Sequence, residues 1–189
     1  TKNSISNKYS KIIKGLENIF EKIKKELVKK KELSQDNFKV WEEKNQHLVH
    51  GFAWIATYIE ALRQINKWGI ELTNKNKLNE FEQLILDISF IEYISQILNG
   101  IPMSQTEFIK ITDFESINKN DELKISENFN FSNVSELKER LVKIAINNDN
   151  IITLENTGLE TEYEQIREQF QKFNSLNVYN NANKWHLED

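Results

Sequence analysis

Two histidines and a glutamate lie at helical spacing near the first third of the chain, a pattern that can bind a metal ion. Glu43, His47 and His50 are separated by four and three residues, so a helix would bring them to one face. A metal site would also need a carboxylate from another helix, such as Asp87 or Glu92. The spacing matches neither the Glu-x-x-His of di-iron bundles nor the His-Glu-x-x-His of zinc proteases. We therefore predict no metal site, and we prefer the interpretation that both histidines are packed or capped.

A candidate ligand slot overlaps the second histidine. Trp54 and Tyr58 share a helical face with His50 and Gly51, so a ligand could lie against the two rings. Aromatic residues at helical spacing are more often part of a core, however. The chain has no cysteine, no Gly-x-Ser-x-Gly elbow, no glycine-rich phosphate loop and no dinucleotide fingerprint. The residue types alone thus identify no catalytic residue.

These residues belong to the most apolar long stretch of the sequence, residues 47–68. Apolar side chains recur there every three or four positions: Leu48, Phe52, Ile55, Ile59, Leu62 and Ile65. This is the period of an α-helix. We predict one long helix over residues 36–73, with Asp36 as its N-cap, at the centre of the fold.

Further helices are expected on both sides of this segment. Apolar stripes predict one helix from Ile5 to Leu27 and another from Leu78 to Leu98, which Gly100 and Pro102 end. The capping-box pattern Ser104-x-x-Glu107 predicts a short helix, and similar patterns at residues 133–136 and 157–160 predict two more. Residues 112–131 are polar and lack a clear period, so we predict an irregular loop.

The composition supports an all-α fold. One proline and five glycines among 189 residues are too few for the many turns of a sandwich or barrel. We predict an antiparallel bundle of about four or five helices over residues 1–155, followed by a C-terminal helix and tail over 156–189. The expected core comprises Ile12, Leu16, Ile19, Phe52, Ile55, Ile59, Leu62, Leu84, Ile88, Ile91 and Leu141.

Charge and hydropathy limit the classes of partner that this chain is expected to bind. The net charge of -4 gives no general attraction to nucleic acid or anionic membranes. No apolar run approaches the roughly 18 residues that span a bilayer, and the first residues lack the apolar region of a signal peptide. We expect a cytoplasmic protein with neither a nucleic-acid nor a membrane partner.

Three stretches resemble acyl-CoA dehydrogenases. Residues 50–64, HGFAWIATYIEALRQ, are similar to a segment in the N-terminal extension of the subgroup that includes methylsuccinyl-CoA dehydrogenases. Residues 99–105, NGIPMSQ, are similar to a motif that follows the third helix of that extension. Residues 166–173, IREQFQKF, and 183–187, NKWHL, resemble the first helix of the dehydrogenase domain. The first motif is fairly specific, whereas the last is shared more widely in the family.

The resemblance implies a parent enzyme that oxidises an acyl-CoA between Cα and Cβ with FAD and passes the electrons to an electron-transfer flavoprotein. The family's flavin-binding β-domain and its C-terminal helical domain, which carries the catalytic glutamate, have no counterpart in these residues. We therefore expect no cofactor in this chain, and we interpret it as the helical module of such an enzyme, with an assembly or site-covering role. A free-standing interaction or dimerisation module is the alternative.

The same stretches contain the candidate contact residues. The candidate ligand or partner contacts are His50, Gly51, Trp54, Tyr58 and Met103. Ile166, Phe170 and Phe173 are expected to pack on the remainder of a dehydrogenase or in a self-association contact. Trp185 and Leu187, two apolar residues close to Asp189, lead us to expect that the natural polypeptide continues.

Overall fold

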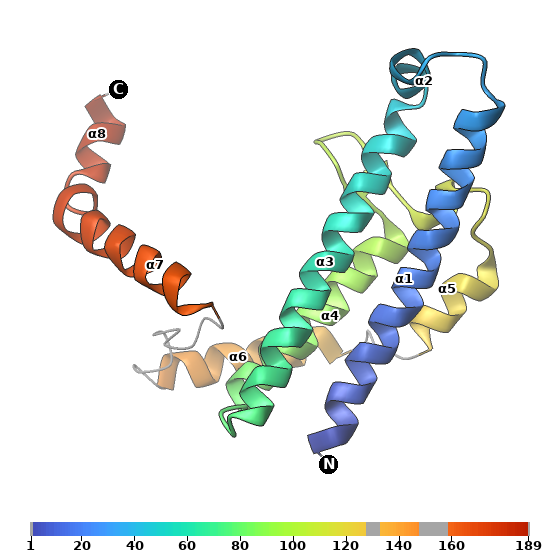
Figure 1. Cartoon of the computed structure of the whole chain (residues 1–189). Helices are drawn as coiled ribbons and strands as arrows, with labels where there is room; N and C mark the ends of the chain where they lie inside the picture. Colours follow the sequence, from blue (N-terminus) through green and yellow to red (C-terminus); the bar gives the residue numbers. More distant parts are fainter. Residues whose placement is uncertain (1, 128–132, 148–158, 189) are drawn as a thin grey trace. The chain divides into compact units, whose positions relative to one another are not determined.

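The computed structural model describes residues 2–127, 133–147 and 159–188, which form two units (Figure 1). The first unit is Thr1–Asp149 and the second is Asn150–Asp189. Helices packed side by side dominate the first unit, and helices also form the second. The all-α prediction is confirmed. The predicted domain boundary at 155/156 lies outside the described residues.

The first helix, α1 (Lys2–Leu33), has one buried face. Its buried side chains follow the helical period: Tyr9, Ile12, Ile13, Leu16, Ile19, Ile23 and Leu27. This face packs on α3 (Gln46–Asn74), which in turn packs on α4 (Glu80–Asn99). Lys30 and Lys31 occupy the last turn of α1, where positive charge is favourable beside the unpaired carbonyls.

The predicted helix over 36–73 is two helices, α2 (Phe38–Lys44) and α3, separated at Asn45. The Asn45 side chain donates to the Trp41 carbonyl at 2.8 Å, so it competes with the helical backbone pattern. Asn37, not Asp36, caps α2, because its side chain accepts from the Val40 N–H at 3.0 Å. Asp36 instead forms an ion pair with Lys44 at 2.8 Å.

Helix α4 is apolar on more than one side and therefore contacts several neighbours. Asn79 and Glu82 form a capping box at its start, and Gly100 ends it with a φ of 137°. Its buried residues are Leu84, Leu86, Ile88, Phe90, Ile91, Ile94 and Ile97. It packs against α3, α6 (Val134–Asn147), β1 (Ile101–Pro102) and η1 (Ile111–Asp113). Of the predicted core residues, Phe52 and Leu141 are half-buried and the others are buried.

The predicted short helix after Ser104 is wrong, because this segment forms a β-hairpin. Strands β1 and β2 (Phe108–Ile109) pair in antiparallel register, with Ile101 opposite Ile109. The Met103 N–H donates to the Glu107 carbonyl at 2.8 Å and closes the turn. Ile101 and Ile109 are both fully buried, and their burial against the helices outweighs the local capping signal.

The irregular loop predicted over 112–131 is also corrected. This stretch begins within η1, a 3₁₀ turn, and contains the helix α5 (Lys119–Ser126). Asn118 caps α5 and Asp121 completes a capping box. Phe114 and Ile117 are buried but precede α5, so Ile125 is the one buried apolar residue of this helix and gives no helical period. Residues 128–132 lie outside the described part of the chain.

The second unit contains α7 (Thr161–Phe173), the π-helical turn η3 (Asn174–Val178) and α8 (Ala182–Glu188). Glu160 precedes α7 as its N-cap residue without a side-chain cap bond. Thr157, the first residue of the predicted capping box, lies outside the described residues. None of the side chains in these three elements is fully buried.

Candidate functional site

The candidate contact residues of α3 form a row of aromatic side chains that continues onto α4. Trp54 Nε1 donates to His50 Nε2 at 3.0 Å, and the Trp54 and Tyr58 rings meet edge to face at 6.3 Å between centroids. Tyr58 lies 4.7 Å from the Tyr93 ring, and its hydroxyl donates to Gln96 Oε1 at 2.6 Å. His50 is exposed, whereas Trp54 and Tyr58 are half-buried. The row therefore offers a ring surface with one accessible imidazole.

The protonation of Tyr58 limits what this row can do chemically. Burial raises the pKa of Tyr58, and the neighbouring Tyr93 raises it further. The phenol therefore stays protonated near neutral pH and acts as a hydrogen-bond donor. A general base needs a pKa close to the working pH, which this environment opposes. The arrangement suits binding rather than proton transfer.

Gly51 is the point at which the hairpin meets α3. A Cβ atom at this position would lie 2.3 Å from Ile109 Cγ1, far inside any real contact distance. Only glycine lets the hairpin approach the helix backbone this closely. Ile109 therefore fills the space beside Gly51, and Met103 of the hairpin turn packs half-buried against the core. The structure joins Gly51 to the hairpin that carries Met103.

Glu43, His47 and His50 are all exposed, and the break at Asn45 places the glutamate on a different helix from the histidines. Within the described ranges, no group of three or more histidines and carboxylates is arranged to hold a metal ion.

Among the residues that the structure describes, no helix combines the length and apolar character needed to cross a membrane.

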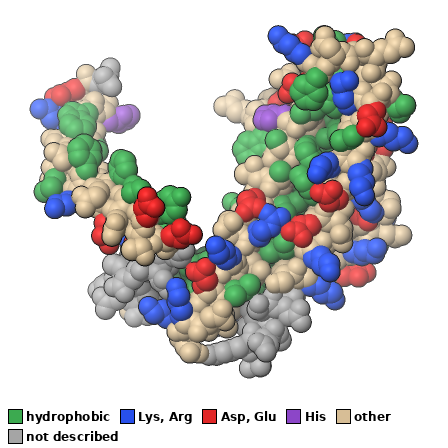
Figure 2. Space-filling model, viewed as in Figure 1, with side chains coloured by type: hydrophobic (Ala, Val, Ile, Leu, Met, Phe, Trp, Pro, Cys, Tyr) green, Lys and Arg blue, Asp and Glu red, His purple; other side chains and the backbone are tan. Residues whose placement is uncertain are grey.

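The predicted interface residues lie on an exposed apolar stripe of α7. Figure 2 shows hydrophobic side chains along the second unit. Ile166 is 48% exposed, Phe173 is 58% exposed and Phe170 is 70% exposed. Tyr163 extends the stripe, so apolar residues recur at steps of three, four and three. This regular spacing places the four apolar side chains on one exposed face of α7.

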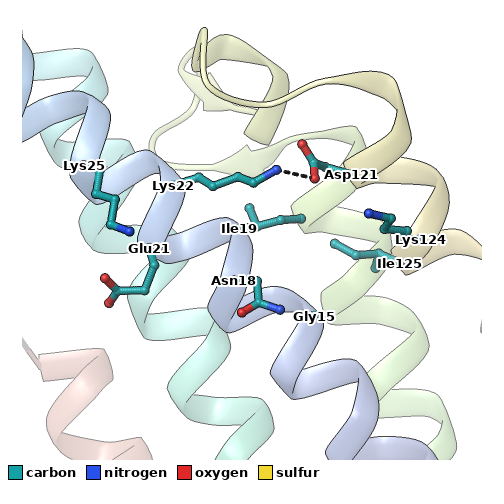
Figure 3. A pocket seen from close by; sticks show the side chains of 9 residues that line it. All are labelled: Gly15, Asn18, Ile19, Glu21, Lys22, Lys25, Asp121, Lys124 and Ile125. Atoms are coloured by element: carbon teal, nitrogen blue, oxygen red, sulfur yellow. Dashed lines mark hydrogen bonds and ion pairs between the residues drawn. The ribbon is translucent and has the colours of Figure 1, made fainter.

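A pocket that the sequence analysis did not identify lies between α1 and α5 (Figure 3). Its volume is about 390 Å³, and its lining combines apolar and charged residues: Gly15, Asn18, Ile19, Glu21, Lys22, Lys25, Asp121, Lys124 and Ile125. Gly15 within the α1 stripe was a signal in the sequence. Helix α5 was not recognisable from its pattern, so the opposite wall could not be placed.

One buried carboxylate organises this pocket. Lys22 Nζ donates to Asp121 Oδ1 at 2.6 Å, and the Asn118 N–H donates to Asp121 Oδ2 at 3.2 Å. The bond from Lys22 lowers the pKa of Asp121, and although burial opposes this, the Asn118 N–H and Lys124 lower it further. Asp121 is therefore ionised at neutral pH and fixes the ammonium group of Lys22.

A second, more open groove of about 610 Å³ adjoins the pocket and shares Lys22 and Lys25 with it. Glu26 is bound there by the Ser116 N–H at 2.7 Å and by Lys30 at 3.0 Å. Burial opposes ionisation of Glu26, but the bonds from Ser116 and Lys30 outweigh it and lower its pKa. Lys30 also pairs with Glu115. Lys25 and Lys29 line the groove as well, and neither forms an ion pair with a residue that the structure describes.

The described residues thus form a helical module with an exposed aromatic row and an exposed apolar stripe, and no catalytic centre is recognisable among them. Sequence comparison relates this module to an acyl-CoA dehydrogenase. The chain is 36% identical over 147 residues to the (2S)-methylsuccinyl-CoA dehydrogenase of Cereibacter sphaeroides, a match that covers 78% of this chain. The chain spans only 27% of the length of that relative. The resemblance seen in the sequence motifs is confirmed. No protein-family model matches the chain.

Proposed function

We propose that this chain is the N-terminal helical module of an acyl-CoA dehydrogenase-like flavoprotein and that the module itself performs no catalysis. The 36% identity to (2S)-methylsuccinyl-CoA dehydrogenase over 147 residues is the observation that carries the proposal. The parent enzyme would oxidise an acyl-CoA at Cα–Cβ with FAD. The remainder of the enzyme would bind the flavin. The enzyme would be located in the cytoplasm.

The role that we propose for the module is assembly or coverage of the substrate site. The exposed stripe of Ile166, Phe170 and Phe173 supports a contact with the remainder of the enzyme. The aromatic row of His50, Trp54 and Tyr58 supports a second contact, because half-buried aromatic rings with satisfied polar atoms are typical of binding surfaces. Neither surface requires the chain to carry a reacting group.

The DNA that follows the codon for Asp189 tests this proposal directly. We expect the same frame, or a neighbouring one, to encode a flavin-binding domain. The 189-residue chain, purified alone, is expected to be colourless, whereas the product that includes the flavin domain should show a flavin absorption band. A flavin band in the isolated chain, or the lack of any dehydrogenase frame nearby, would contradict the proposal.

A free-standing dimerisation module is the second candidate function. Leu159, Tyr163, Ile166, Phe170 and Phe173 follow one another at alternating steps of four and three residues, the spacing of a coiled-coil seam. Sedimentation of the isolated chain separates the candidates. A stable dimer that does not bind any dehydrogenase domain would favour this second function over the first.

A further inference from the structure

We propose that the pocket between α1 and α5 binds a small organic anion with an apolar body, for which a short-chain carboxylate is the simplest example. This inference is independent of the relation to acyl-CoA dehydrogenases. It rests on the residues that line the pocket: a glycine that packing does not require, an apolar floor and an excess of lysine. Figure 3 shows these side chains around the space.

Gly15 is the first observation. A glycine inside a helix costs stability relative to alanine, so its presence calls for a local reason. At Gly51 and Gly69 the reason is packing, because a Cβ would meet Ile109 at 2.3 Å and Leu86 at 2.8 Å. At Gly15 a Cβ would have no atom within 4 Å. The missing side chain at Gly15 therefore leaves space in the pocket and exposes the helix backbone to whatever enters it.

The floor and size of the pocket are the second observation. Ile19 of α1 and Ile125 of α5, each 3% exposed, approach each other from the two helices (Figure 3). Together with Gly15 they give the pocket an apolar base. Its volume of about 390 Å³ falls within the range of small-molecule sites. A chain of several methylene groups fits these properties better than a hydrated inorganic ion.

The rim is the third observation, and it selects the sign of the ligand charge. Three lysines face two carboxylates in the lining, although the whole chain has a net charge of -4. Asp121 is already paired with Lys22 at 2.6 Å, and Glu21 lies 3.7 Å from Lys24. Lys25 forms no ion pair with any residue that the structure describes. A carboxylate would therefore meet unneutralised positive charge at Lys25.

Hexanoate and hexylammonium test the proposal as a matched pair, because they share one apolar chain and differ in charge. We would titrate each into the ¹⁵N-labelled 189-residue chain and follow the Gly15 amide resonance. Hexanoate is expected to shift it saturably, with a Kd on the order of 1 mM. Hexylammonium should bind at least about threefold more weakly, since it lacks the attraction to Lys25.

Three variants locate the site. Gly15→Leu fills the pocket and should abolish saturable binding, while its unchanged helical circular dichroism shows that the fold is kept. Lys25→Gln should weaken hexanoate by about two- to fivefold, and Lys11→Gln, on the same helix outside the pocket, should change nothing. The proposal is overturned if hexanoate gives no saturable shift at Gly15, if hexylammonium binds equally well, or if Gly15→Leu binds as the wild type does.

Discussion

At the scale of single residues, two polar clusters join α1 to its neighbours and set how stability should depend on pH. One is the Lys22–Asp121 pair with α5. The other surrounds Tyr9, whose hydroxyl donates to Asp87 Oδ1 at 2.5 Å and accepts from Gln83 Nε2 at 3.1 Å. Both clusters include a buried group, so each helps to fix the position in which α1 packs against its neighbours.

Asp121→Asn is expected to lower the free energy of unfolding at pH 7 by about 1–2 kcal/mol, because the ion pair with Lys22 and the capping bond to Asn118 are both weakened. The pKa of Asp121 is lowered in the folded state, so its contribution is present above the ordinary aspartate pKa and is lost as the pH falls. Urea unfolding between neutral pH and about pH 3 should therefore show the two proteins converging.

A matched control for this change is Glu115→Gln. Glu115 also pairs with a lysine of α1, Lys30, but its side chain is 80% exposed. An exposed pair contributes little, so this variant should differ from the wild type by less than about 0.5 kcal/mol. Equal losses in the two variants would show that burial of Asp121 has no special role.

Tyr9→Phe tests the second cluster at alkaline pH. Burial raises the pKa of Tyr9, and the bond to Asp87 raises it further. Because the folded state holds this proton more tightly, its contribution is complete below the ordinary tyrosine pKa of about 10 and is lost as the pH rises above it. The variant should lose about 1–3 kcal/mol at pH 7 and a smaller amount at alkaline pH. Tyr179→Phe, at an exposed position, should remain close to the wild type throughout.

At the scale of elements, the glycines of α1 and α3 distinguish helix propensity from packing. Gly15→Ala should stabilise the fold by up to about 1 kcal/mol, because the new methyl group contacts no other atom and alanine has a higher helix propensity than glycine. Gly51→Ala should destabilise it by about 1–3 kcal/mol, because the methyl group collides with Ile109 and displaces the hairpin. Thermal unfolding of the two variants would measure this. Changes of the same sign would contradict the close approach at Gly51.

The elements also show why some parts of this fold were predictable and others were not. The buried faces of α1, α3 and α4 repeat at three and four residues over many turns, so local pattern and burial agree. In the hairpin, by contrast, burial depends on Ile101 and Ile109, and pairing between residues eight apart left no repeated signal. Helix α5 is only eight residues long, and its two buried residues, Asp121 and Ile125, are too few to define a face.

The candidate site was predictable to a similar degree. His50, Trp54 and Tyr58 lie in one row because they share one regular helix, which the spacing indicated. The continuation of that row through Tyr93 and Gln96 depends on how α3 and α4 pack. The pocket at Gly15 depends on α5 in the same way. Contacts between elements, rather than patterns within them, were the information that the sequence did not carry.

At the scale of the whole molecule, the exposed apolar stripe of α7 raises the question of which surface covers it. In the first unit, the apolar faces of α1, α3 and α4 are buried, whereas Phe170 in the second unit is 70% exposed. A side chain of this kind contributes roughly 1.5–3 kcal/mol when it is buried, so a contact over the stripe would be substantial. We therefore expect the stripe to be covered, either by the remainder of a dehydrogenase, by the first unit or by a second copy of the chain.

Phe170→Asp tests this expectation. A carboxylate in the centre of an apolar contact leaves a buried charge without a partner, so the contact should be lost. We expect the variant either to reduce the assembly measured by sedimentation or to lower the melting temperature, depending on whether the stripe packs between chains or within one. Gln169→Asp adds the same charge one residue away, outside the stripe, and should alter neither quantity. Phe170→Asp could instead behave like the control and keep the wild-type melting temperature and hydrodynamic size, both with and without the dehydrogenase domain. In that case the stripe is a solvated surface and the contact does not exist.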